Sequence, residues 1–124
     1  MNKISNSPEF RFCYYTPLYD ETVSFYKHRL QLEELRSWDR GSCQKGTIFR
    51  TPNGTGQIEI EEGTIAPVLQ GELYIEVENV DQWYDKIVQE KIRIISPLSD
   101  TSYGHRNFKF ADPNHLIIGL FKYL

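Results

Sequence analysis

The order of predicted secondary-structure elements occurs twice along this chain, and this repetition limits the possible folds more than any other feature. In each copy a strand is followed by a helix and then by three strands, over residues 9–62 and 69–124. The stretch 63–71 between the copies is the only linker-like segment. One copy alone would leave a face of its sheet bare, so we expect both copies to form a single domain, residues 1–124.

Residue periodicity identifies the elements of each copy. Apolar and polar side chains alternate in residues 10–15 and 57–61, which is typical of a half-buried strand. Eight strands are predicted, at residues 10–15, 35–38, 47–50, 57–61, 73–77, 92–95, 107–110 and 116–121. Asp112-Pro113-Asn114 has the composition of a tight turn and separates the last two.

Helical spacing of apolar residues indicates one helix in each copy. The first begins at Pro17 or Asp20, and the second is capped by Asn79 and ends near Lys91. The expected buried stripes are Val23, Phe25, Tyr26 and Leu30 in the first helix, and Val80, Tyr84, Ile87 and Val88 in the second.

Composition excludes several classes of partner. The formal charge of −3 and the pI near 5.6 argue against nucleic acid and are compatible with a cationic ligand. No apolar stretch approaches the length of about 20 residues that spans a bilayer, and residues 1–8 lack the apolar core of a signal peptide. With only two cysteines, in unrelated contexts, we expect reduced thiols and a cytoplasmic protein without membrane partners.

The order of elements and three short motifs resemble the vicinal oxygen chelate superfamily, which includes glyoxalase I, extradiol dioxygenases, fosfomycin-resistance transferases and bleomycin-resistance proteins. The motifs are Thr22-Val23-Ser24-Phe25-Tyr26, Val77-Glu78-Asn79-Val80-Asp81 and Phe110-Ala111-Asp112-Pro113-Asn114. The resemblance implies an α+β fold in which two βαβββ modules form a curled mixed sheet around a shared cleft, with the helices outside. It also implies a homodimer, for which exposed strand edges give a physical reason.

Enzymes of this superfamily hold a divalent metal on four side chains, and the resemblance places those positions on or near Arg11, Glu59, Glu72 and Gly119. Arginine has no lone pair to offer a metal, and glycine has no side chain. Two carboxylates without an imidazole make a poor transition-metal site. We therefore predict no metal, no other cofactor and no catalytic residues, and we interpret His28, His105 and His115 as solvated or structural.

The segment Tyr103-Gly104-His105-Arg106 resembles the entry to the seventh strand in the bleomycin-resistance branch, whose members bind ligands without a catalytic metal. Two roles remain open for Arg106. It could lie at the edge of the cleft, or it could form a surface salt bridge with Asp100 or Asp112.

Alternation places a mixed acidic and aromatic set of side chains on the cleft side. This set is Arg11, Cys13, Tyr15, Gln57, Glu59, Glu61, Glu72, Tyr74, Glu76, Ile117, Gly119 and Phe121. Rings offer stacking area and carboxylates attract positive charge, which suits a planar cation. The candidate ligand-binding residues are Arg11, Tyr15, Trp38, Glu59, Glu72, Tyr74, Arg106 and Phe121. The alternative is that the rings fill a collapsed core and Glu59 pairs internally with Arg11.

Cys13 is expected to be a buried small side chain and not a nucleophile, because no positioned base can be named for it. The predicted function is metal-independent binding that sequesters a cationic aromatic small molecule. Two alternatives are a metal-dependent lyase or dioxygenase with an atypical site, and a degenerate module that binds another protein.

Overall fold

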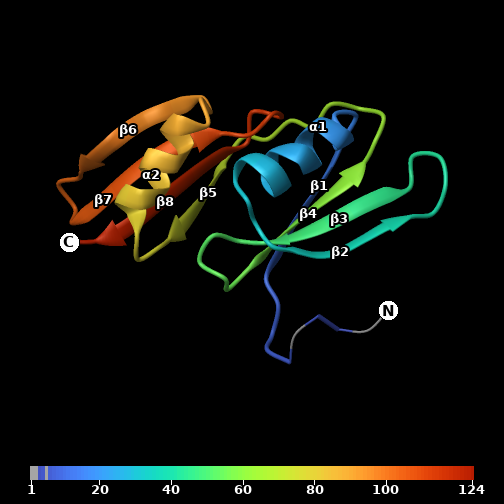
Figure 1. Ribbon diagram of the computed structural model, residues 1–124, viewed down its shortest axis with the longest axis horizontal. Coiled ribbons are helices and arrows are strands. Elements are labelled where there is room, and N and C mark those ends of the chain that lie inside the picture. Colours follow the sequence, from blue (N-terminus) through green and yellow to red (C-terminus); the bar gives the residue numbers. More distant parts are fainter. Residues whose placement is uncertain (1–2, 5) are drawn as a thin grey trace. The chain divides into compact units, whose positions relative to one another are not determined.

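The computed structural model describes residues 3–4 and 6–124, which form two compact units, one up to Pro67 and one from Val68 to Leu124. Each unit contains one strand, one helical segment and three further strands, in that order (Figure 1). The predicted α+β class with two βαβββ modules is confirmed.

In the first unit a helical segment covers one face of a four-stranded sheet. The elements are β1 (Arg11–Thr16), α1 (Tyr19–Ser24), the π-helical turn η1 (Phe25–Arg29), β2 (Glu34–Asp39), β3 (Lys45–Arg50) and β4 (Gln57–Glu62). The strand order is β1-β4-β3-β2, with β1 parallel to β4 and the other pairs antiparallel.

The π-helical turn explains how consecutive aromatic residues are both buried. The amide of Leu30 bonds the carbonyl of Phe25 at 3.0 Å, five residues back. This wider turn directs both Phe25 and Tyr26 inward, and the Tyr26 ring lies 5.8 Å from that of Phe49 on β3. His28 is exposed on the outer side of the turn, as predicted.

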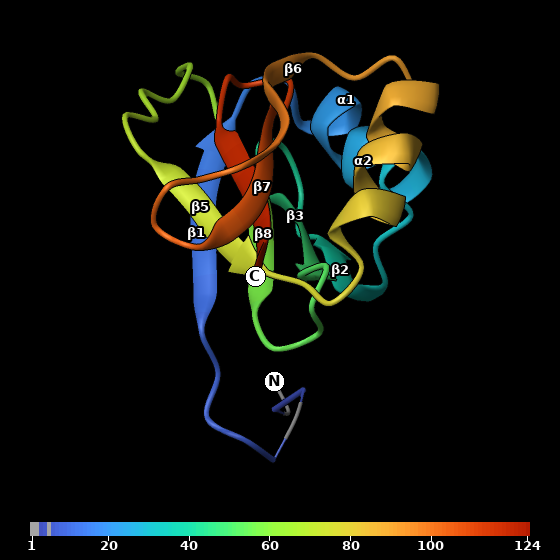
Figure 2. The ribbon, with the colours of Figure 1, turned by 90° about the vertical axis from the view of Figure 1, so that its left-hand side faces the viewer.

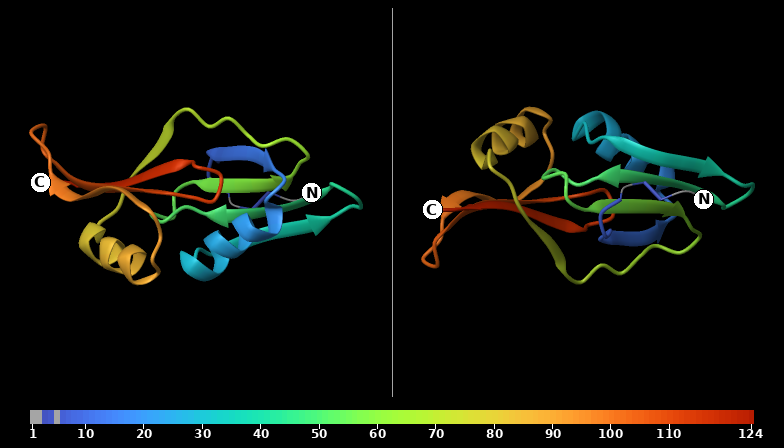
Figure 3. Two further views of the ribbon diagram at one scale, coloured as in Figure 1. Left: turned by 90° about the horizontal axis from the view of Figure 1, so that it is seen from above. Right: turned by 90° about the horizontal axis from the view of Figure 1, so that it is seen from below.

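The second unit repeats the arrangement. It consists of β5 (Glu72–Glu76), α2 (Val80–Gln89), β6 (Ile94–Asp100), β7 (His105–Ala111) and β8 (Ile117–Tyr123), with the strand order β5-β8-β7-β6. Helix α2 runs along one face of this sheet (Figures 2 and 3). Val80 and Ile87 of α2 are buried there, and the Tyr84 ring lies edge-on to Phe108 at 5.1 Å.

Two local predictions in the second unit are wrong. Val88 is 48% exposed, because one residue turns a helix by about 100° and so moves Val88 away from the side on which Ile87 is buried. Strand β6 also starts and ends later than predicted and contains Pro97. Proline is tolerated there because β6 is an edge strand, whose outward amides need no partner.

The strand-turn-strand prediction for the C-terminal segment is confirmed. One carboxylate oxygen of buried Asp112 accepts bonds from the amides of Asn114 at 2.8 Å and Leu116 at 2.9 Å. His115 has φ of 67° in this turn and is exposed, in agreement with its predicted solvation. Among the described residues, no helix is long and apolar enough to cross a membrane.

Candidate functional site

The strand register of the first unit brings the predicted acidic residues together on one face. Cys13 is the partner of Glu59, and Tyr15 is the partner of Glu61, across the parallel pair β1 and β4. Partner residues point to the same side of a sheet, so Arg11 and Gln57 belong to that face as well.

Arg11 is the centre of a hydrogen-bond network on this face. Its Nη1 donates to Glu59 at 2.9 Å, its Nε to Gln57 at 3.0 Å, and its Nη2 to Glu9 at 2.9 Å. Glu59 is only 8% exposed. The internal Arg11–Glu59 pair, which the sequence left as an alternative, is therefore present.

Glu61 forms a second carboxyl contact on the same face. Burial and a hydrogen bond with Glu59 raise the pKa of Glu61, while its bond with the Tyr15 hydroxyl opposes this shift. The negative charge of Glu61 in turn raises the pKa of Tyr15, which is 57% exposed.

We expect Glu61→Gln to stabilise the protein at neutral pH. A raised carboxyl pKa in the folded state means that the protonated form is favoured there. Glu61 thus stabilises the fold below the pKa of an unfolded glutamate, and this contribution is lost as the pH rises through the folded pKa. The advantage of the variant should disappear in acid, as measured by urea unfolding against pH. Glu78→Gln controls for the loss of one charge, and an equal gain in both variants would contradict the expectation.

Cys13 is exposed, so its predicted burial is wrong. Strand β1 is an edge strand, so within the described residues of this sheet no second strand shields its side chains on the outer side. Partial shielding of the thiol and the negative charge of Glu59 raise the pKa of Cys13, against the opposite effect of Arg11. The thiol is therefore less reactive than an ordinary one.

Trp38 lies on the same face as Gly46, its partner on β3. The indole covers the backbone there so closely that a Cβ at Gly46 would overlap the ring. The guanidinium carbon of Arg40 lies 5.3 Å from the centre of the Trp38 ring, within range of a cation–π interaction.

In the second unit an aromatic cluster forms on the sheet face opposite α2. Its members are Tyr74, Tyr103, His105, Phe121 and Tyr123. The Phe121 ring stacks on Tyr74 at 4.3 Å with 8° between the planes, and on His105 at 4.5 Å with 19°. Tyr103 and Tyr123 lie edge-on to His105 at 5.1 and 4.7 Å.

Gly119 lies directly beneath the Tyr74 ring of this cluster. A Cβ at this position would lie 2.6 Å from Cδ1 of Tyr74, so the ring rests directly on the backbone of β8. The absence of a side chain at Gly119, which argued against a metal there, thus leaves the space that the Tyr74 ring occupies.

A hydrogen-bond chain orders two members of the cluster. The side-chain amide of Asn107 donates to Oη of Tyr74 at 2.9 Å, and the same oxygen lies 3.1 Å from Nδ1 of His105. Burial raises the pKa of Tyr74. The sequence interpretation missed His105, although extending the alternation of Asn107 and Lys109 back by two residues would have placed it on this face.

Charged residues around the cluster differ in their pairing. Glu72 forms an ion pair with Lys109 at 2.9 Å. Glu76 is exposed and is the strand partner of Phe121, and its side chain has no hydrogen bond or ion pair within residues 3–4 and 6–124. Its carboxylate is therefore available beside the aromatic rings.

Arg106 lies on the opposite face of β7 from His105 and Asn107, because successive side chains of a strand point to opposite faces. Its Nε bonds Asp81 at 2.8 Å and its Nη1 bonds Asp100 at 2.9 Å. The Asp100 salt bridge was one of the two predicted roles. The bond from Arg106 also lowers the pKa of Asp81.

The residues at the four positions that the resemblance assigns to a metal do not fit one. Glu59 is bonded to Arg11 and Glu72 to Lys109, so each carboxylate already faces a cation of its own unit. Where the chain is described, no three residues of the types His, Cys, Asp and Glu gather in a group that could hold an ion.

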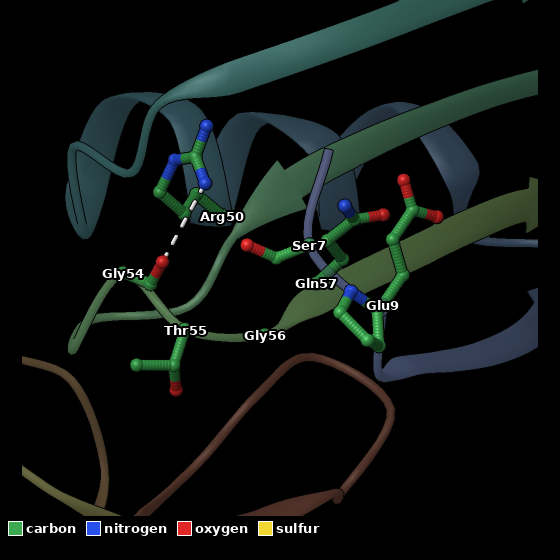
Figure 4. Close-up of a pocket in the computed structure, with 8 residues that line it drawn as sticks. Ser7, Glu9, Arg50, Gly54, Thr55, Gly56 and Gln57 are labelled. Carbon is green, nitrogen blue, oxygen red and sulfur yellow. Dashed lines mark hydrogen bonds between the residues drawn. The ribbon is translucent and has the colours of Figure 1, made fainter. Parts of the chain in front are cut away.

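A polar pocket of about 440 Å³ lies in the first unit beside the β3–β4 hairpin (Figure 4). Pro8, Glu9, Arg50 and Thr55 are among its lining residues. Nη1 of Arg50 donates to the carbonyl of Gly54 at 3.5 Å. No pattern in the chain predicted this pocket.

The glyoxalase/bleomycin resistance protein/dioxygenase superfamily model matches residues 10–120, and the chain belongs to this superfamily. No curated protein matches the sequence.

Three solved structures share the fold. TioX from Micromonospora sp. ML1 is 15% identical with a TM-score of 0.78, covering 95% of this chain and 100% of its own. TnmS3, an antibiotic binding protein from Streptomyces sp. CB03234, is 17% identical with a TM-score of 0.77, covering 95% of this chain and 97% of its own. A mutant of the fosfomycin resistance protein FosX from Listeria monocytogenes, complexed with Mn(II), is 17% identical with a TM-score of 0.73. The match covers 97% of this chain and 94% of FosX.

Proposed function

We propose that this protein binds a planar, positively charged small molecule without a catalytic metal, and thereby sequesters it. The observation that carries the proposal is the aromatic cluster, in which the Phe121 ring stacks on Tyr74 and His105 and the Tyr74 ring lies against the bare backbone of Gly119. Tyr103 and Tyr123 are 67% and 64% exposed and extend the ring surface toward solvent. Such a surface suits a flat ligand because stacking is tolerant of the ligand's substituents.

The charge of the ligand follows from the residues beside the rings. Glu76 is the strand partner of Phe121 and has no cation of its own in the described part of the chain. A cationic ring lying on the cluster would face both the π-electrons and this carboxylate. In the first unit Tyr15, Glu61 and Trp38 lie on one face, since Tyr15 pairs with Glu61, Glu61 with Gly46 and Gly46 with Trp38, and they offer a second aromatic and acidic surface.

Metal independence is supported by the donor set. Arg11 and Gly119 cannot coordinate a metal, and the two remaining carboxylates are paired with cations. The antibiotic-binding description of TnmS3 makes an antibiotic a reasonable ligand class for this chain. We further propose a cytoplasmic homodimer. Each sheet ends in unpaired edge strands, β1 and β2 or β5 and β6, which a second copy could cover.

The test uses N-methylacridinium, a planar cation, titrated against the full chain by fluorescence and thermal shift. Tyr74→Leu should weaken binding by about tenfold, since stacking on one aromatic ring contributes roughly 1–3 kcal/mol. Glu76→Gln should weaken it by about fivefold, as expected for one partly exposed charge pair.

Trp83→Leu on α2 is the control, because α2 packs on the face of the sheet that carries Phe108, and His105 and Phe121 have the opposite alternation. Binding should survive treatment with EDTA. Absence of binding, or loss of binding after metal removal, would overturn the proposal.

A further inference from the structure

We infer that His105 makes the aromatic cluster select ligands that carry an in-plane hydrogen-bond acceptor, such as a ring nitrogen or a carbonyl oxygen. This inference rests on the proposed function and concerns the same site. It assigns the ligand class more narrowly than stacking and charge do.

The hydrogen-bond chain favours one tautomer of His105. Asn107 Nδ2 is a donor, so Oη of Tyr74 accepts from it at 2.9 Å. The Tyr74 hydroxyl still has its own hydrogen to donate, and we assign it to His105 Nδ1, 3.1 Å away, because a ring nitrogen is a stronger acceptor than the Tyr103 hydroxyl, which also bonds Tyr74. A neutral imidazole that accepts at Nδ1 carries its hydrogen on Nε2.

The Nε2–H group has no partner among the described residues. His105 is half-buried, with its face on Phe121 and its edges near Tyr103 and Tyr123. Within residues 3–4 and 6–124 its Nε2 makes no hydrogen bond, and it is not among the buried polar atoms without a partner. The structure thus presents an accessible donor within the aromatic surface.

This donor distinguishes between ligands of equal shape. A ligand that covers Nε2–H without an acceptor removes the hydrogen bond of this group to solvent and provides no other. A ligand N–H group at the same place would also repel the Nε2–H group. A ligand with a lone pair in the plane of the imidazole keeps the bond. The site should therefore favour an acceptor over a donor at this edge.

The protonation state is tested by ¹⁵N NMR of the histidine rings in the full-length protein. The chain has only three histidines, so the spectrum is simple, and His105→Phe assigns the signal. We expect the Nε2–H form for His105 at mildly alkaline pH. The Nδ1–H form would overturn the inference.

Selectivity is tested with acridine and carbazole, two planar three-ring compounds that carry an acceptor nitrogen and an N–H donor, at a pH where acridine is uncharged. The wild type should prefer acridine by about fivefold, the size expected for one hydrogen bond. His105→Phe retains a ring on Phe121 and should abolish the preference. His28→Phe makes the same exchange on the exposed side of η1 and should retain it.

Asn107→Asp provides a test in the opposite sense. A carboxylate at this position accepts the Tyr74 hydroxyl, so Oη must accept from Nδ1–H and Nε2 becomes the acceptor. Carbazole should then be preferred. Equal binding of both probes to the wild type, or a preference that survives His105→Phe, would overturn the inference. N-methylacridinium offers neither a ring lone pair nor an N–H, so its binding reports separately whether the proposed function holds.

Discussion

Gly119→Ala is expected to lower the free energy of unfolding by about 2 kcal/mol, which is typical of overpacking in a tight contact. The new Cβ would lie 2.6 Å from Cδ1 of Tyr74, and the ring cannot retreat without leaving Phe121 and its bonds to His105 and Asn107. Binding of N-methylacridinium should weaken by about tenfold, because one stacking surface is displaced. Urea unfolding and fluorescence titration measure the two effects.

Two further variants test whether the effect comes from the contact between Gly119 and the Tyr74 ring. Gly71→Ala is the matched control, since a Cβ there meets no atom within 4 Å and should change the stability by less than about 0.5 kcal/mol. Adding Tyr74→Leu to Gly119→Ala removes the ring that the Cβ meets, so the double variant should lose less stability than the sum of the single variants. Additive losses, or equal effects of the two alanine substitutions, would show that Tyr74 does not rest on Gly119.

Arg11→Met is expected to lower the free energy of unfolding by about 2 kcal/mol, below the full cost of breaking a buried pair because Arg11 is partly exposed. The substitution keeps most of the side-chain volume but leaves Glu59, 8% exposed, without its cation and beside Glu61. Gln57 loses its partner in the same step. Urea unfolding at neutral pH measures the change.

Arg50→Met is the control for this prediction. Arg50 pairs with Glu33 at 3.3 Å, but the Glu33 side chain is 65% exposed, so the loss should stay within about 0.5 kcal/mol. Glu59→Gln added to Arg11→Met removes the unpaired charge and should restore part of the stability. If Arg11→Met costs no more than Arg50→Met, the network is not a structural element of the first unit.

The sequence predicted the fold well because its signals are local. Alternation in residues 10–15 and 57–61 places Arg11 and Glu59 on one face as soon as the two strands pair, and the register confirms this. The predicted helix stripe failed at Val88, where one helical step separates a buried side chain from an exposed one. Cys13 was also placed incorrectly, since the sequence does not show which strand lies at the edge of a sheet.

The candidate site was predicted less completely because its contacts join residues that are far apart in the chain. Tyr74 and Phe121 were identified as aromatic residues of the same face, but their stacking depends on the space above Gly119. His105 was set aside as an isolated histidine, although the structure stacks it on Phe121 and bonds it to Tyr74.

The sequence by itself determined the two βαβββ modules, the faces of their strands and the residue types at the four positions where related enzymes bind a metal. The modules and the strand faces follow from periodicity, and the four positions follow from the resemblance to the superfamily. The tertiary structure decided which partners those residues take: Arg11 for Glu59, Lys109 for Glu72 and the Tyr74 ring for the bare backbone of Gly119. Such pairings depend on strand register and on side-chain packing between strands, which no local pattern in the chain encodes.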